Sequence, residues 1–285
     1  MTIKNIMYMF LLINFMMAPA IHVMEQPDKQ QETELVQREK REIDPVVALF
    51  LQGWYKKKSH LSVLDQELLE KILKYVKQIR NGEALLNEVA DNDQDRVERL
   101  LKEHNIDVNI KDENGNTALN LAIILNKPYL LNLVKMLLEA GINLNLQNKD
   151  GYTSLISAVA VNYSKKIVQI LLDNGANPNM QDYCGWTALH WAAIENKLKM
   201  ARMLLDKGVN LNIPNNIGRT ALHLAVKMHN PKIVQMLIDY DANPTIQDIE
   251  GCTALDWAIK QEDQEIINLL IDAQEKSDNI GTSKS

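Results

Sequence analysis

Residues 182–215 read DYCGWTALHWAAIENKLKMARMLLDKGVNLNIPN, and variants of this stretch recur along the chain. A second pattern lies downstream in each copy, as in Leu171-Leu-Asp-Asn-Gly-Ala-Asn-Pro-Asn and Leu204-Leu-Asp-Lys-Gly-Val-Asn-Leu-Asn. The string Gly-x-Thr-(Ala/Ser)-Leu begins at Gly115, Gly151, Gly185, Gly218 and Gly251. The intervals between these glycines are 36, 34, 33 and 33 residues. Self-similarity at such a period predicts a solenoid of stacked supersecondary units.

Each residue type in the pattern has a physical reason. The glycine permits the positive φ of a tight turn, and the threonine two positions later can cap a helix. The Leu-Leu pair supplies apolar surface between units, and the small alanine of each first helix lets neighbouring helices approach closely. An Asx side chain three residues before the glycine can bond the turn backbone; it is Asp112, Asn148, Asp182, Asn215 or Asp248.

Two copies carry a recognisable signature. Thr187-Ala-Leu-His-Trp-Ala and Thr220-Ala-Leu-His-Leu-Ala resemble the T-P-L-H-x-A string of the ankyrin repeat, whose period is about 33 residues. The resemblance covers roughly residues 84–273. It implies a mainly α solenoid of helix-turn-helix units with β-hairpin connections. Alanine or serine replaces the proline throughout, and Asn120, Ile156 and Asp256 replace the histidine, so we expect those three units to be less rigid where the first helix starts.

The repeats divide the second part of the chain. We expect atypical units at both ends, because the outer faces of a solenoid meet water or a lid. Residues 274–285 are expected to form a flexible tail. The predicted repeat region, 81–273, holds six units: 82–112, 113–148, 149–182, 183–215, 216–248 and 249–273.

The first twenty residues have the layout of a secretory signal peptide. Lys4 precedes an apolar stretch from Ile6 to Met17, and Ala18-Pro19-Ala20 offers small residues for cleavage. The apolar stretch is shorter than the roughly 20 residues of a membrane span. We therefore predict cleavage after Ala20 and a secreted or extracytoplasmic (periplasmic) protein, with an uncleaved membrane anchor as the alternative. The Asn-, Lys- and Ile-rich composition favours an AT-rich bacterial gene.

Residues 21–80 precede the repeats. Residues 21–45 are predicted to be a polar linker, because their mixed charges bury little apolar surface. Within the helical segment predicted at 46–80, apolar residues recur at spacings of three and four between Ser62, a possible N-cap, and Arg80. Asn81-Gly82 is expected to end that helix. The helix is interpreted as a lid on the repeats or, since Leu61–Leu73 loosely resembles the start of an F-box, as a recruitment helix for a ubiquitin-ligase adaptor.

Catalytic and nucleic-acid-binding patterns are missing from the sequence. There is no P-loop, dinucleotide fingerprint, nucleophile elbow or H-E-x-x-H motif, and the net charge of −6 provides no overall basic field. His190 and His223 occupy the same place in neighbouring units and are predicted to orient backbone through the family's Thr–His pairing. Cys184 and Cys252 lie two units apart, too far for a disulfide. We predict a protein without enzymatic activity, cofactor or metal.

The ankyrin resemblance implies that a partner binds to the concave side, which is formed by the turn tips and the first helices. Large side chains beside the turn glycine have no evident role in the fold, and Tyr, Trp and Arg are enriched at binding hot spots. Trp191 and Trp257 are assigned to the core between repeats. The predicted binding residues are Tyr152, Tyr183, Trp186, Ile194, Glu195, Ile217, Arg219, Lys227 and Met228.

The sequence therefore predicts a non-catalytic module that binds a protein partner by rigid docking. One alternative is a ubiquitin-ligase adaptor in which the repeats select the substrate. Another is a secreted effector that acts on host proteins.

Overall fold

The computed structural model describes residues 63–103, 106–126, 129–161 and 165–282. The chain divides into two compact units, Met1–Lys77 and Gln78–Ser285. Of the first unit only the beginning of helix α4 is described. The predicted signal peptide (1–20), the polar linker (21–45) and the Ser62 cap lie outside the described residues. No helix within the described ranges is both long and apolar enough to cross a membrane.

The second unit is built from helix pairs. Every pair after the first has a short first helix of seven residues and a longer second helix, as in α10 and α11. The described helices are α4 (Val63–Asp91), α5 (Gln94–Leu101), α6 (Ala118–Ile124), α7 (Leu130–Glu139), α8 (Ser154–Ala160), α9 (Lys165–Asp173), α10 (Ala188–Ile194), α11 (Leu198–Asp206), α12 (Ala221–Lys227), α13 (Pro231–Asp239), α14 (Ala254–Lys260) and α15 (Gln264–Thr282).

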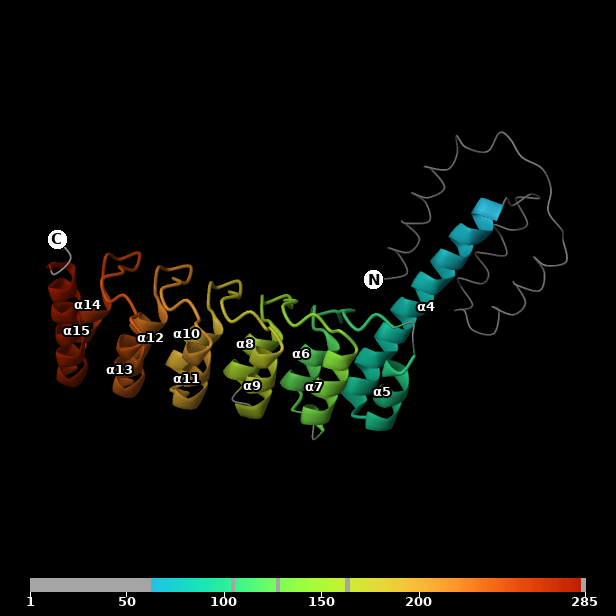
Figure 1. Ribbon diagram of the computed structural model, residues 1–285, viewed down its shortest axis with the longest axis horizontal. Helices are drawn as coiled ribbons and strands as arrows, with labels where there is room; N and C mark the ends of the chain where they lie inside the picture. The colour runs from blue at the N-terminus through green and yellow to red at the C-terminus, as the bar shows by residue number, and fades with distance from the viewer. Residues whose placement is uncertain (1–62, 104–105, 127–128, 162–164, 283–285) are drawn as a thin grey trace. The chain divides into compact units, whose positions relative to one another are not determined.

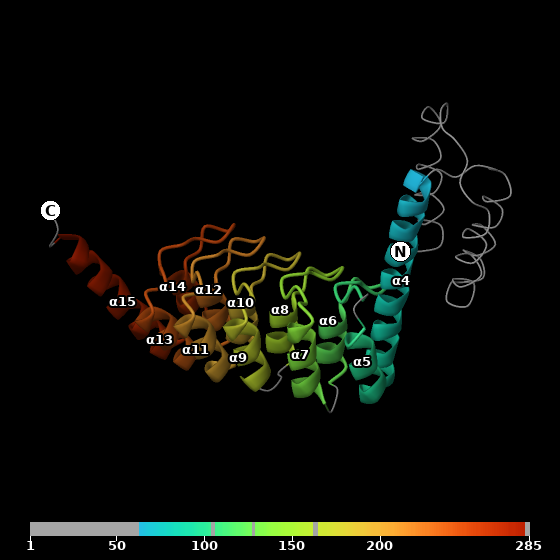
Figure 2. The same cartoon turned by 45° about the vertical axis from the view of Figure 1, so that its right-hand side comes forward.

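The pairs stand side by side in chain order (Figure 1). First helices α6, α8, α10, α12 and α14 pack against one another in one layer, and α5, α7, α9, α11, α13 and α15 form a second layer behind them (Figure 2). One continuous apolar core runs between the layers from Leu85 to Leu270. The small inward residue of each first helix, such as Ala192 or Ala225, has an exposed fraction of 0%, which lets neighbouring helices approach closely.

The threonine at the start of each first helix caps it, as predicted. Thr117 and Thr153 accept hydrogen bonds from the backbone N–H three residues on. At Thr187 and Thr253 the cap is reciprocal, because the side chain at the third helical position also accepts from the threonine backbone N–H. At Thr220 the return bond is made, from its backbone N–H to His223 Nδ1 at 3.3 Å. Such reciprocal caps satisfy two backbone donors that the helix itself leaves without partners.

The loops that connect the pairs all project to one side (Figure 1). In each loop the Asx side chain bonds the turn as predicted; Asp182 Oδ1 accepts from the N–H groups of Cys184 and Trp186 at 2.9 and 2.8 Å. The expected β-hairpins are not confirmed, since the described residues contain no strand. The chain reverses within Asp182–Trp186, closed by the bond from Asp182 N to Trp186 O, and this reversal is too short for a ladder.

Neighbouring loops are hydrogen-bonded to each other. The backbone N–H of Tyr183 donates to Asp150 O, and that of Asn216 donates to Cys184 O. Such close stacking requires glycine: Gly151 has φ +83°, and a Cβ there would lie 2.5 Å from Tyr183 N. Gly251 has φ +75°, but no later loop stacks on it, and a Cβ there would meet nothing within 4 Å.

A ladder of asparagines joins the repeats where each second helix leads into the next loop. Asn143 N donates to Asn109 Oδ1 of the previous repeat at 2.7 Å, and Asn145 N then donates to Asn143 Oδ1 at 3.0 Å. The same two steps recur through each later repeat as far as Thr245 N, which donates to Asn243 Oδ1. The recurring asparagines in the sequence are therefore an inter-repeat backbone clamp.

The structure differs from the sequence prediction at both ends of the repeats. Gly82 does not end its helix, because α4 continues to Asp91. A Cβ at Gly82 would lie 2.7 Å from Asp107 O and 2.8 Å from Ile110 Cγ2, so this glycine allows the following loop to pack on the helix. At the other end, α15 continues past Ala273, where the predicted repeats end, to Thr282.

Two matched glycine substitutions test the loop stacking. Gly251→Ala should cost only the strain of a positive φ, about 1–2 kcal/mol of unfolding free energy. Gly151→Ala should cost clearly more, because the added methyl group also collides with the Tyr183 backbone. Urea unfolding followed by circular dichroism measures both. Equal losses would mean that contact between the loops contributes nothing to stability.

Candidate functional site

The predicted binding residues fall into two groups by exposure. Tyr183 and Ile217, at turn tips, are 64% and 38% exposed, and Met228, at the end of α12, is 46% exposed. Glu195 and Lys227 are also exposed. These five side chains project from successive repeats, from the turn loops and the carboxyl ends of first helices. The other four predicted residues are partly or wholly buried: Tyr152, Trp186, Ile194 and Arg219.

Tyr152 and Trp186 belong to an aromatic cluster centred on Trp191. The Trp186 and Trp191 ring centroids lie 4.9 Å apart, and Tyr152 meets Trp191 edge-on at 5.8 Å. The indole N–H of Trp191 donates to Asp182 Oδ2 at 3.2 Å. Burial raises the pKa of the Tyr152 hydroxyl, and the nearby Asp182 carboxylate adds to this. The cluster joins two repeats, so Trp186 stacks within the chain and keeps only part of its surface for a partner.

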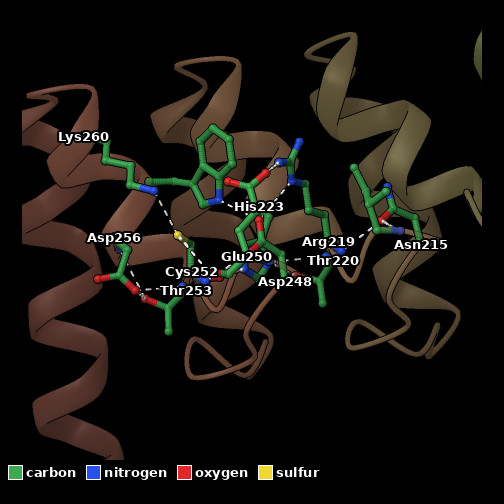
Figure 3. A network of polar contacts seen from close by, with 12 residues as sticks. Asn215, Arg219, Thr220, His223, Asp248, Glu250, Cys252, Thr253, Asp256 and Lys260 are labelled. Carbon is green, nitrogen blue, oxygen red and sulfur yellow. Dashed lines mark hydrogen bonds and ion pairs between the residues drawn. The ribbon is translucent and has the colours of Figure 1, made fainter.

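Arg219 has a different role from the predicted one. It is 8% exposed, and its Nε and Nη2 bind Asp248 Oδ2 and Glu250 Oε1, each at 3.1 Å, in the next turn loop (Figure 3). Its guanidinium also lies 4.3 Å from the centroid of the Trp257 ring. Arg219 therefore ties two loops together, and we remove it from the contact surface.

Asp248 is the buried carboxylate at the centre of this network. Its Oδ1 accepts from Glu250 N and Cys252 N, and its Oδ2 accepts from Arg219 and from the indole N–H of Trp257 at 3.0 Å. Burial by itself would raise the pKa of Asp248, but these hydrogen bonds outweigh burial and lower the pKa to about 2. The carboxylate stays ionised at neutral pH and fixes the indole of Trp257, which remains partly exposed.

Further exposed residues of the same surface were not predicted. Ile124 and Leu125 at the end of α6 are 41% and 43% exposed, and Val161 after α8 is 50% exposed. Lys260 ends α14 and is exposed. All four stand at the seventh or eighth position after the capping threonine, the positions that Lys227 and Met228 occupy in their repeat. Aligning the repeats on the capping threonine could therefore have identified these four residues from the sequence.

His190 and His223 bridge repeats instead of lining a site. In both residues Nδ1 accepts from the capping threonine's backbone N–H, so Nε2 carries the proton and donates to Arg219 O or Cys252 O of the next repeat. Burial lowers the pKa of both histidines, that of His190 to about 4. Asn120 takes the histidine's place in its repeat, since its Nδ2 donates to Tyr152 O at 3.1 Å.

Other chemical features of the described residues are few. Cys184 and Cys252 are free thiols. Within the described ranges, no three His, Cys, Asp or Glu side chains gather in a way that could hold a metal ion.

A family model described as "Ankyrin repeats (3 copies)" matches residues 59–148, 85–182, 126–215, 155–248 and 214–280 in overlapping windows. The chain belongs to the ankyrin repeat family. Ankyrin repeat protein 14 of vaccinia virus is 39% identical to it over 61 residues. That match covers 21% of the present chain and 24% of the viral protein, so the chain spans less than a quarter of that relative.

Solved structures share the ankyrin fold over two thirds of the chain. An ankyrin repeat domain of Acinetobacter baumannii (ABAYE2397) superposes with a TM-score of 0.62 at 31% identity, covering 67% of this chain and 97% of its own. The ankyrin repeat protein EF0377 gives 0.61 at 28% identity with the same coverage. A third match is a chain in the structure of the Bdellovibrio bacteriovorus predatory endopeptidase Bd0816 in complex with the immunity protein Bd3460. Its TM-score is 0.56 at 32% identity, covering 66% and 97% of the two chains.

The buried histidines predict a pH dependence of the ankyrin array. His190 binds a proton near pH 6.5 when unfolded but only near pH 4 when folded. Between these values the unfolded state holds more protons, so the free energy of unfolding should fall with decreasing pH, by up to about 1.4 kcal/mol per pH unit from this residue. His190→Asn, which copies the natural choice at Asn120, should lack this component while keeping the bridging donor. Urea unfolding at pH 7 and pH 4.5 measures it, and identical pH slopes for both proteins would contradict the neutral buried imidazole.

Proposed function

We propose that this ankyrin array is a non-catalytic protein-binding module and that its partner docks on the binding face. This face comprises the turn tips and the exposed carboxyl ends of the first helices, the side expected to be concave. One observation carries the proposal: large apolar side chains stay exposed there, among them Tyr183 at 64%, Val161 at 50% and Met228 at 46%. They are dispensable for the fold, since the homologous positions also hold Lys149, Glu195 or Gln261.

The backbone of this face supports docking without rearrangement. Each turn is closed by its Asx side chain, and each loop is bonded to the loop before it. Ordering a flexible loop would subtract from the binding free energy, and a face already ordered avoids that penalty. The Bd0816 structure contains a complex with the immunity protein Bd3460, which is consistent with an ankyrin-like chain acting in protein recognition. No described residue cluster points to catalysis.

Site-specific photocrosslinking tests the face. Tyr183 and Met228 are replaced, one at a time, by a photoreactive phenylalanine in the protein expressed in its own cells. Both positions should crosslink the same protein, identified by mass spectrometry. The matched control is the same replacement at Arg202, an exposed residue of α11 in the second layer. Equal crosslinking from position 202, or none from 183 and 228, would contradict the proposed face.

We also propose that the protein is exported, because residues 1–20 have the layout of a signal peptide. The intact mass of the protein from its native cell should correspond to a chain that begins at Ile21. A chain that retains Met1 would contradict cleavage and favour the membrane anchor. The secreted-effector hypothesis depends on this result. The ubiquitin-ligase adaptor remains a sequence-based prediction, since its motif lies largely outside the described side chains.

A further inference from the structure

The last helix pair of the array, α14 and α15, leaves apolar positions uncovered that are buried in the earlier repeats. Ile259 in α14 is 53% exposed, whereas the side chains at the same position of the four preceding repeats have an exposed fraction of 0%. Those side chains are Ile123, Val159, Ala193 and Val226. Leu255, one turn earlier, is partly exposed, although its counterparts in the same four repeats are buried. The counterparts of Leu255 are Leu119, Leu155, Leu189 and Leu222.

The second helix of the pair shows the same change. Ile267 is partly exposed, whereas the side chains at its position in the earlier second helices are fully buried. They are Val134, Val168, Ala201 and Val234. Ile271 is 40% exposed, and its counterparts Leu172 and Leu205 are buried. The last repeat differs from these in having no later helix pair packed against it. We call Leu255, Ile259, Ile267 and Ile271 the end face.

The end face is an inter-repeat interface of which one side is missing. On the side toward the earlier repeats α14 packs against α12 and α15 packs against α13, and the pair stands at one end of the row (Figure 1). On the outer side a Cβ at Gly251 would meet nothing within 4 Å, whereas one at Gly218 would lie 2.9 Å from the next loop. Terminal repeats of a solenoid need a polar outer face to remain soluble, and this face is apolar.

The opposite end of the repeats has a different surface. Residues 78–103, the part of α4 in the second unit together with α5, expose no large apolar side chain. Their exposed side chains are polar apart from Ala90, and include Glu83, Asn87 and Arg96. A second copy of the chain therefore cannot continue the stack head to tail through apolar contacts. The apolar surface that a second copy offers at an end of its repeats is its own end face.

We propose that the end face is a dimer interface on which the end face of a second copy docks about a two-fold axis. This inference goes beyond the proposed function, because the interface lies at the end of the array and leaves Tyr183 and Met228 free for another partner. In such an isologous contact each copy contributes the same patch, and the contact closes at two copies. Burial of leucine and isoleucine side chains against each other is non-directional, so the patch can pair with itself.

The charged residue beside the patch is compatible with this contact. Asp256 is exposed, and it stands where His190 and His223 reach the next repeat. Its Oδ2 accepts from the backbone N–H and the hydroxyl of Thr253 at 2.8 and 2.7 Å. The carboxylate therefore keeps its hydrogen bonds within its own helix cap when a second copy docks.

Sedimentation velocity of the full chain tests the interface. The wild type should change from monomer to dimer as its concentration rises to about 100 µM, the range of a micromolar dissociation constant. Ile259→Lys/Ile271→Lys places two ammonium groups in the apolar contact and should raise the dissociation constant at least about ten-fold. Both positions are exposed in the single chain, so the variant should keep the circular dichroism spectrum of the wild type.

A matched pair on the binding face is the control. Val161→Lys/Met228→Lys makes the same chemical change at side chains of similar exposure, 50% and 46%, and should leave the dimer unchanged. A wild type that stays monomeric at about 100 µM would overturn the proposal, as would a dimer that survives the lysines at 259 and 271. Loss of the dimer in the binding-face variant alone, or species that grow beyond two copies, would also overturn it.

Photocrosslinking tests the two-fold arrangement. A photoreactive phenylalanine replaces Ile259, and copies with and without heavy isotopes are mixed so that crosslinks between copies are recognised by mass spectrometry. These crosslinks should fall within residues 253–273 of the second copy. Crosslinks to residues 78–103 would mean head-to-tail stacking and would overturn the two-fold contact.

Discussion

The contact on which the array depends is the hydrogen bond from each turn loop to the loop before it. Tyr183 N can donate to Asp150 O only because residue 151 is a glycine without a Cβ. A Cβ on Gly151 would lie 2.5 Å from Tyr183 N and would push the two loops apart. The same glycine adopts the positive φ that closes the turn, so one residue satisfies a local and an inter-repeat requirement together. The spacing of the loops in turn sets how closely the first helices stand, which is why alanine lines their buried side.

The asparagine ladder imposes the same spacing where each second helix leads into the next turn loop. Its bonds alternate between steps within a repeat, as from Asn145 N to Asn143 Oδ1, and steps between repeats, as from Asn177 N to Asn145 Oδ1. Because loop stacking and the ladder both fix the repeat spacing through the backbone, the apolar layer between the helices needs only side chains of matching size. This explains how a core almost without large aromatics holds the array together, and why few positions on the binding face have a role in the fold.

Most of the fold could be predicted from the sequence because its determinants are local and repeated: the Asx turn, the capping threonine and the buried alanine recur at fixed spacing. Gly82 misled the prediction because its role is in tertiary packing and not in ending the helix. Its missing Cβ leaves room for the loop at Asp107 and Ile110 to pack on α4. Arg219 misled it because hot-spot statistics describe residue types and ignore partners within the chain. Its partner Asp248 is the turn residue of the next repeat, so aligning the repeats, rather than considering one alone, could have found the pair.

Departures from the repeat pattern differ in whether the structure replaces the contact that is lost. Asn120 replaces a histidine at a position with a role in the fold, and the structure compensates, because the amide donates to the same backbone oxygen that the imidazole would reach. Ile156 at the equivalent position has no side-chain donor, so its side chain cannot make the inter-repeat bond there. Lys227 and Lys260 replace the apolar residues of earlier repeats at an exposed position, so there the repeat pattern tolerates either class of side chain.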